Sequence, residues 1–241
     1  MARALGHKGR FAIAYLLLGA AAGAAIGAAI VLIQRPAPEP PPPWSTWKPA
    51  VGSLGSTAQA IASHVGGSYR LSDGRQLARV VLSAPSEAAA NVEAIALADR
   101  PGAVTVFNPD TTMLYTLCGT EQNCRLGGQA STAGVDALRR EALELALYTF
   151  KYAKVADVAV FFPPGEGDNR SKNVFFFPRA DLAGQLKRPL RVTLPHGAAP
   201  TRGRVDPREL PTLDNLTGGH HFRFDVETIN NRHVLVLQPV A

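Results

Sequence analysis

Charged residues are scarce in this 241-residue chain, at 18%, while apolar residues make up 46%. That apolar share is too high for an intrinsically disordered protein. The sequence also lacks the short motifs of common catalytic and nucleotide-binding sites, since it contains no His-Glu-x-x-His, no Gly-x-Ser-x-Gly and no phosphate-binding glycine loop. We therefore predict no catalytic residue, no cofactor and no metal site, which leaves enzymatic activity uncertain and favours a noncatalytic protein.

Positive charge is missing from the part of the chain where a nucleic-acid-binding protein would need it. The formal net charge is +6, but the residues after position 49 contain 20 Lys and Arg against 18 Asp and Glu, a net charge of +2. A nucleic-acid-binding domain concentrates basic residues on its folded part. We predict no nucleic-acid partner.

Cysteine is nearly absent, because Cys118 and Cys124 are the only two. Five residues separate them, whereas redox-active pairs are usually separated by two. In an oxidising compartment the pair would close a small loop and stabilise the fold by about 2 kcal/mol. We predict a structural disulfide; the alternatives are a reduced pair in a cytoplasmic protein and a redox-active pair.

The most prominent feature present is an apolar run, Phe11–Ile33, without a charged residue over 23 positions. As a helix it would be about 35 Å long, enough to cross a hydrocarbon core of about 30 Å. The alternative is a signal peptide cleaved near Ala22, but signal cores are usually about 7–15 residues long. Cleavage there would also leave Ile26–Ile33 as an apolar mature terminus. We predict a single transmembrane helix.

Basic residues predict the orientation of this helix. Arg3, Lys8 and Arg10 precede it, whereas Arg35 and Lys48 follow it. The positive-inside tendency then places the N-terminus in the cytoplasm. We predict a cytoplasmic tail at 1–10, a transmembrane helix at 11–33, a proline-rich stalk at 34–49 and an extracytoplasmic domain at 50–241, anchored in the cell membrane.

Three glycines recur at every fourth position of the apolar run: Gly19, Gly23 and Gly27. Such a stripe lets a second helix approach closely. It predicts a homodimer or a partner helix packed on this stripe, unless the register is a by-product of an alanine- and glycine-rich sequence.

Proline-rich residues 36–43 predict an extended polyproline spacer of about 25 Å. Trp44 and Trp47 follow, and we expect them to pack against the domain rather than rest near lipid headgroups. Ser45 and Lys48 match the Ser-x-x-Lys pattern of penicillin-interacting serine enzymes, but the surrounding prolines disfavour the helix that this chemistry needs.

The remaining sequence alternates between helix and strand patterns. Helices are predicted at Thr57–Val65 with Ser56 as N-cap, Ser86–Ala98, Val135–Tyr152 and Asp181–Leu186. Strands are predicted as successive pairs, at Tyr69–Leu71 with Gln76–Leu82, Val104–Phe107 with Met113–Leu117, Val158–Phe162 with Val174–Phe177, and Phe222–Ile229 with His233–Leu237. This order indicates an α+β domain with a mostly antiparallel sheet. Helix 135–152 is apolar on most sides, which predicts a central position.

Two groups of polar residues are interpreted as structural. Arg140, Glu141 and Glu144 lie on a narrow polar stripe of helix 135–152 and are predicted to form ordinary ion pairs on the helix surface. His220 and His221 are adjacent, and adjacent strand residues face opposite sides, so we predict a turn leading into the last hairpin rather than a metal site.

Basic residues are concentrated between positions 170 and 208, where nine basic and two acidic residues give a net charge of +7. The nine are Arg170, Lys172, Arg179, Lys187, Arg188, Arg191, Arg202, Arg204 and Arg208. If they converge, they form a face suited to anionic lipids, wall polymers or an acidic protein; if they scatter, they are a solvated surface.

These features together predict a membrane-anchored, extracytoplasmic binding module of the cell envelope, without catalytic activity. Its predicted partners are the lipid bilayer and either an envelope protein or an anionic polymer. The alternative is an extracytoplasmic hydrolase whose site is assembled from residues far apart in the sequence.

Overall fold

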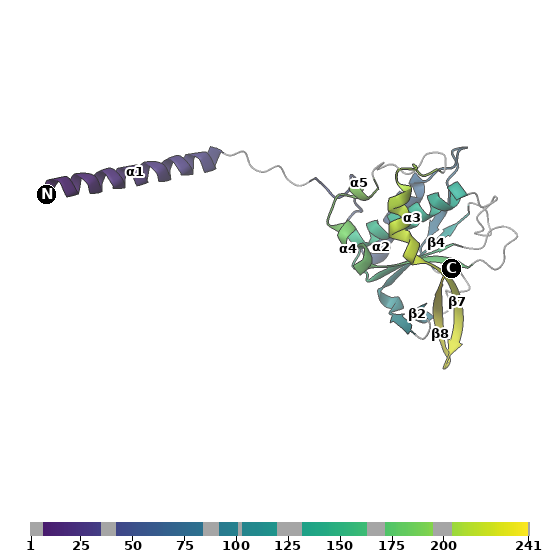
Figure 1. Ribbon diagram of the computed structural model, residues 1–241. Coiled ribbons are helices and arrows are strands. Elements are labelled where there is room, and N and C mark those ends of the chain that lie inside the picture. The colour runs from purple at the N-terminus through teal and green to yellow at the C-terminus, as the bar shows by residue number, and fades with distance from the viewer. Residues whose placement is uncertain are drawn as a thin grey trace. The chain divides into compact units, whose positions relative to one another are not determined.

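The computed structural model describes residues 7–34, 42–83, 92–100, 103–119, 132–162, 172–194 and 204–240 (Figure 1). The chain divides into two compact units, Met1–Pro42 and Pro43–Ala241. The two units are described separately below.

The first unit contains one long helix, α1 (His7–Gln34). Its segment Phe11–Ile30 has a mean hydropathy of 2.0 and no buried residue, so it is long and apolar enough to cross a membrane. An N-terminal signal sequence has the same properties, so α1 is compatible with a single-pass membrane protein and does not establish its orientation. Gly19, Gly23 and Gly27 leave open space where a Cβ would stand, and a helix packed on them stays a prediction.

The second unit is built on one mixed sheet of eight strands in the order β1-β4-β5-β6-β7-β8-β2-β3. The strands are β1 (Arg79–Val81), β2 (Val92–Arg100), β3 (Ala103–Phe107), β4 (Thr112–Cys118), β5 (Asp157–Phe162), β6 (Asn173–Pro178), β7 (His221–Ile229) and β8 (Arg232–Pro239). Strand β4 pairs with β5 and β8 with β2 in parallel, and the other neighbouring pairs are antiparallel. The predicted α+β class is confirmed, with a sheet that is mixed.

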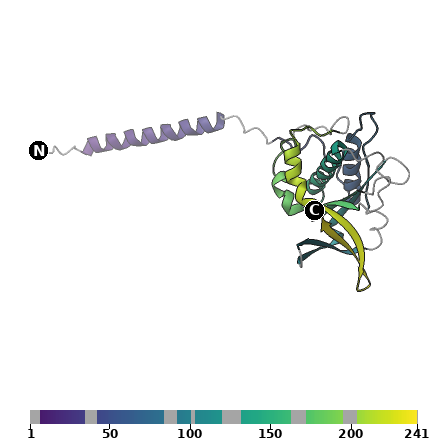
Figure 2. The same cartoon turned by 45° about the vertical axis from the view of Figure 1, so that its right-hand side comes forward.

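Helices cover one face of this sheet (Figures 1 and 2). They are α2 (Leu54–Ser68), α3 (Thr132–Tyr152), α4 (Arg179–Leu186), α5 (Leu190–Thr193) and α6 (Leu210–Thr217), with 3₁₀ turns η1 (Pro109–Thr111) and η3 (Gly218–His220). Helix α3 packs against α2, α4 and α6 and against β5 and β6. Every residue from Arg140 to Phe150 is buried, which confirms the predicted central helix.

The sheet curls on itself. Strands β4 and β3 are six places apart in the strand order, a separation of about 29 Å in a flat sheet. Only residues 108–111 join them, and a connection of that length reaches at most about 18 Å. Strand β3 therefore folds back over the sheet, where the ring of Phe107 lies 4.7 Å from that of Phe176 in β6. Strand residues form a second hydrophobic core inside this curl.

The last hairpin forms as its sequence pattern predicts. Phe222 and Phe224 are buried and Val226 is half-buried, while the residues between them are exposed. The turn residues Asn230 and Asn231 have φ values of 52° and 62°, which is the left-handed conformation that a two-residue hairpin turn of this kind requires and asparagine tolerates. Figure 2 shows this hairpin, β7 and β8, extending away from the helices.

Two predictions of local structure are wrong. Residues 92–98, predicted as part of a helix at Ser86–Ala98, belong to strand β2; residues 86–91 lie outside the described part. Pairing with β8 and complete burial of Ile95 outweigh the helix preference of the alanines. Strands β3 and β4 exist, but they do not pair with each other: β3 pairs with β2, and β4 pairs with β1 and β5.

Helix α2 also differs from its prediction at both ends. Its N-cap is Ser53, whose Oγ accepts a hydrogen bond from the Ser56 N–H at 3.2 Å. The helix continues through Gly66, where an added Cβ would lie 2.7 Å from Val80 Cγ2, so glycine allows β1 to pack closely. The predicted hairpin that follows is reduced to a single bridge between Arg70 and Gln76.

Candidate functional sites

A group of ionisable side chains lies between α3, the C-terminal end of α2 and the N-terminal end of α6. Arg140 Nε donates to Glu209 Oε2 at 2.7 Å. Arg140 Nη1 donates to Tyr69 OH at 2.7 Å and to Glu144 Oε2 at 3.2 Å, and Tyr69 OH donates to Glu144 Oε2 at 2.7 Å. All four residues are at most 7% exposed, so this buried ionic cluster is closed to solvent.

The buried ionic cluster corrects the prediction of surface ion pairs on α3. Arg140 and Glu144 do pair at i and i+4, but inside the core. Burial, followed by the negative charge of Glu144, raises the pKa of Tyr69, so the phenol stays neutral and keeps the proton that it donates. The cluster joins three helices through mutual hydrogen bonds. It therefore holds α3 in place.

Glu141 is buried beside this cluster and has no hydrogen-bond partner for either carboxyl oxygen in the described part of the chain. Burial, and then the negative charge of Glu144, raises its pKa well above the usual value. The side chain is fully buried, and burial without a partner favours the neutral acid over the carboxylate. Its burial was missed in the sequence, because Glu141 shares the narrow polar stripe of α3 with Arg140 and Glu144.

The chain enters the second unit through residues 43–49, here called the docked segment. Trp44 packs edge-on against Tyr148 and Tyr152 of α3, at ring distances of 5.3 and 5.9 Å. Trp47 stacks on His64 of α2 at 4.0 Å. The expected packing of both tryptophans against the domain is therefore present, and it ties the entering chain to α2 and α3.

Replacing Trp44 by alanine should release the docked segment and lower the free energy of unfolding by about 1–3 kcal/mol, because the side chain is half-buried. Thermolysin digestion of the full chain should then cut between residues 43 and 51 faster than in the parent protein. Val104→Ala is the matched control, since Val104 is exposed and lies outside this segment. Equal cleavage rates in the two variants would show that Trp44 does not hold the segment.

The predicted anionic-partner face is only partly described, because Arg170 and Arg202 lie outside the described residues. The Arg179 guanidinium is bound to backbone carbonyls at the end of α3. Lys172 Nζ lies 3.4 Å from Asp225 Oδ1. Lys187 and Arg188 are exposed between α4 and α5, Arg191 is exposed in α5, and Arg204 and Arg208 are exposed before α6. Whether the set forms one face stays a prediction.

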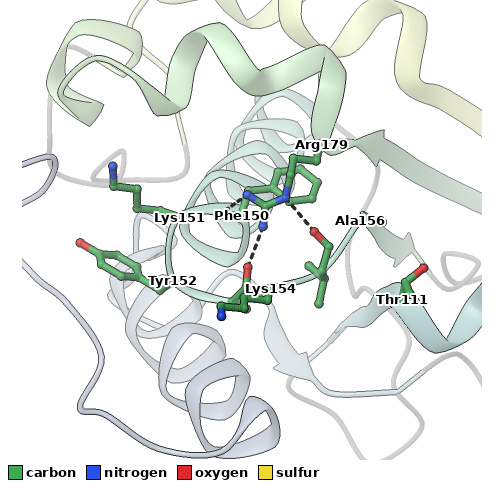
Figure 3. Close-up of a pocket in the computed structure, with 9 residues that line it drawn as sticks. Thr111, Phe150, Lys151, Tyr152, Lys154, Ala156 and Arg179 are labelled. Atoms are coloured by element: carbon green, nitrogen blue, oxygen red, sulfur yellow. Dashed lines mark hydrogen bonds between the residues drawn. The ribbon is translucent and has the colours of Figure 1, made fainter.

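Arg179 takes part in the structure of the α3 C-terminus. Its guanidinium donates to the carbonyls of Phe150, Ala153 and Val155 at 2.7, 2.7 and 2.8 Å, and it lies 5.1 Å from the Phe150 ring centre. These groups line an open pocket of about 620 Å³. Figure 3 shows the side chains of Lys151 and Tyr152 pointing away from Arg179. The pocket therefore brings no set of reactive groups together.

The other polar residues singled out in the sequence have structural contacts. His220 Nδ1 lies 3.0 Å from the Phe176 carbonyl, and His221 stacks on Phe175 at 4.8 Å. Ser45, outside any helix, donates to the Trp47 carbonyl and lies 3.0 Å from Tyr152 OH. Among the residues that the structure describes, no group of three or more His, Cys, Asp and Glu side chains could hold a metal ion.

The structure describes only one of the two cysteines. Cys118 is 4% exposed at the end of β4, and Cys124 lies outside the described residues. The structural disulfide stays a prediction.

The chain matches no protein-family model, no curated protein and no solved structure. Its own fold and surface are therefore the basis for inferring a function.

Proposed function

We propose that the chain is a membrane-anchored, noncatalytic binding module whose folded unit lies outside the cytoplasm. The observation that carries this proposal is the division of the chain into an apolar helix of membrane-spanning length and a separate compact unit. The excess of basic residues before the apolar run Phe11–Ile33 supports a cytoplasmic N-terminus. A folded unit tethered in this way meets its partners at the membrane surface.

The arrangement of the charged residues favours binding over catalysis. The members of the buried ionic cluster bind one another out of reach of solvent, so they offer no group to a substrate. Arg179, the arginine in the open pocket, is already bound to three carbonyls. The exposed basic residues Lys187, Arg188 and Arg191, at and after the end of α4, are available instead, and they suit an anionic partner.

The anchor and its orientation are tested by fractionation and protease protection. We expect the full-length chain to stay in the membrane pellet after washing at alkaline pH. Protease that is added outside the cells, without breaking them, should reach and cut residues 43–241. Release of a chain lacking residues 1–22 would identify a cleaved signal sequence, and protection of the folded unit in intact cells would place it in the cytoplasm; either result would contradict the proposal.

A further inference from the structure

The point where the chain enters the folded unit lies beside the junction of α4 and α5. The Trp44 carbonyl accepts a hydrogen bond from the Leu190 N–H at 2.6 Å. Trp44 Nε1 donates to the Gln185 carbonyl at 3.5 Å. Residues 185–190 are thus held against the docked segment, although about 140 residues separate them in the sequence.

Four basic residues gather at this entry point. Lys187, Arg188 and Arg191 are exposed within or next to the stretch that Trp44 contacts. Lys151 joins them from α3, because its Nζ donates to the Leu186 carbonyl at 3.3 Å and lies 5.5 Å from the Trp44 ring centre. We call these four residues the entrance surface.

The charge of the entrance surface is not neutralised within the described part of the chain, where none of the four forms an ion pair. The acidic residue of α4, Asp181, lies in its first turn, at the other end of the helix. Its Oδ2 is 4.0 Å from His220 Nε2. The four positive charges therefore act together on whatever faces them.

Covalent connectivity keeps the entrance surface near a bilayer that holds α1. Eight residues, 35–42, separate the end of α1 from Pro43, and a connection of that length reaches at most about 30 Å. Such a tether keeps the local concentration of lipid headgroups high, so weak contacts become significant. Anionic headgroups attract clustered Lys and Arg within about one Debye length, roughly 8 Å at physiological salt.

We propose that Lys151, Lys187, Arg188 and Arg191 bind the anionic phospholipid headgroups of the membrane in which the chain is anchored. This inference rests on the proposed membrane anchor and adds a partner for the folded unit. The docked segment has the positioning role: by fixing Trp44 to α3 and to the α4–α5 junction, it presents the basic residues where the tether begins.

The test uses the fact that Trp44 and Trp47 are the only tryptophans in the chain, so their fluorescence reports on the entry point. The full-length protein is reconstituted in nanodiscs of phosphatidylcholine, alone or mixed with phosphatidylglycerol, that contain a dansyl-headgroup lipid. Energy transfer from tryptophan to dansyl should be greater in the anionic nanodiscs, and raising the salt concentration should return it to the neutral level.

Charge reversal identifies the residues responsible. In R188E/R191E the ratio of docked to undocked domains should fall by at least about 25-fold, since each basic residue near an anionic surface contributes about a fivefold factor. The matched control is R223E/R232E, which makes the same charge change on exposed residues of β7 and β8 and should leave the transfer unchanged. Equal transfer in neutral and anionic nanodiscs, or equal loss in the two variants, would overturn the proposal.

The remaining outcomes separate this inference from the proposed function. If the chain fails to insert into nanodiscs, the membrane anchor itself is wrong. If it inserts without any dependence on anionic lipid, only the lipid contact is wrong. If R188E/R191E abolishes co-purification with an acidic protein or polymer and leaves the energy transfer unchanged, the entrance surface serves that partner and not lipid.

Discussion

Replacing Arg140 by methionine should lower the free energy of unfolding of the second unit by about 3–5 kcal/mol. Arg140 is 1% exposed and hydrogen-bonds to Glu144, Glu209 and Tyr69. Without it, two buried carboxylates lose their positive partner, and the desolvation cost of those charges is no longer offset. Urea unfolding of the detergent-solubilised full chain, followed by the fluorescence of Trp44 and Trp47, measures the change.

The neighbouring arginine provides the control. Arg139 lies on the same helix and pairs with Asp136 at 3.2 Å and Asp214 at 2.7 Å, but its side chain is 19% exposed and Asp214 is 64% exposed. Solvent screens the pair with Asp214, and Arg139 is less buried than Arg140, so Arg139→Met should cost less than Arg140→Met. Similar losses in the two variants would show that the buried ionic cluster does not stabilise the packing of α3.

Replacing Glu141 by methionine should have the opposite effect and raise the free energy of unfolding at neutral pH by about 1–3 kcal/mol. The Glu141 carboxyl is fully buried, and neither oxygen has a hydrogen-bond partner in the described residues. Methionine has a similar volume and fills the same space without a polar group. Chemical denaturation at pH 7 of the parent and the variant measures the difference.

The same substitution should change how stability depends on pH. The pKa of Glu141 is raised by burial and then by Glu144, so its contribution to stability is fully present below the unfolded-state pKa, about 4.3. As the pH rises, the unfolded chain loses this proton while the folded protein keeps it. Stability therefore falls by up to about 1.4 kcal/mol per pH unit until the folded-state pKa is passed. The difference in free energy of unfolding between the parent and Glu141→Met should grow from about pH 4 upward.

A second carboxyl on α3 gives the contrast. Glu144 accepts hydrogen bonds from Tyr69 and Arg140, so Glu144→Gln should lower the free energy of unfolding by about 1–3 kcal/mol. Glu141 and Glu144 lie three residues apart on one helix, yet Glu141→Met should stabilise the protein and Glu144→Gln should destabilise it. If Glu141→Met destabilises the protein and the stability difference does not vary with pH, Glu141 has a partner and is ionised in the folded state.

Helix α3 connects these stability predictions with the proposed function. One end of its buried face holds Arg140 and Glu144, and the other end packs Tyr148 and Tyr152 against Trp44. The docked segment and the entrance surface therefore rest on the central helix of the unit. A loss of packing at Arg140 is expected to weaken the presentation of the basic residues as well.

Local patterns in the sequence were sufficient to predict several elements. The apolar run of α1, the central helix α3 and the hairpin of β7 and β8 each depend on periodicity, on a long apolar stretch or on a turn such as Asn230-Asn231. Those signals lie within one element or in two adjacent ones. They are therefore readable without knowing what packs against the element.

Contacts between residues far apart in the sequence determined the features that these local patterns did not predict. Strand β2 was mistaken for a helix because its parallel partner β8 lies about 140 positions later, and pairing with it outweighs local propensity. Glu141 and Glu144 resembled surface residues because they share a narrow polar stripe with Arg140, and the i, i+4 spacing of Arg140 and Glu144 is the same in solvent and in a core. Only the packing of α2, α6 and the sheet around α3 determined that one carboxyl is paired, the other is isolated, and both are buried.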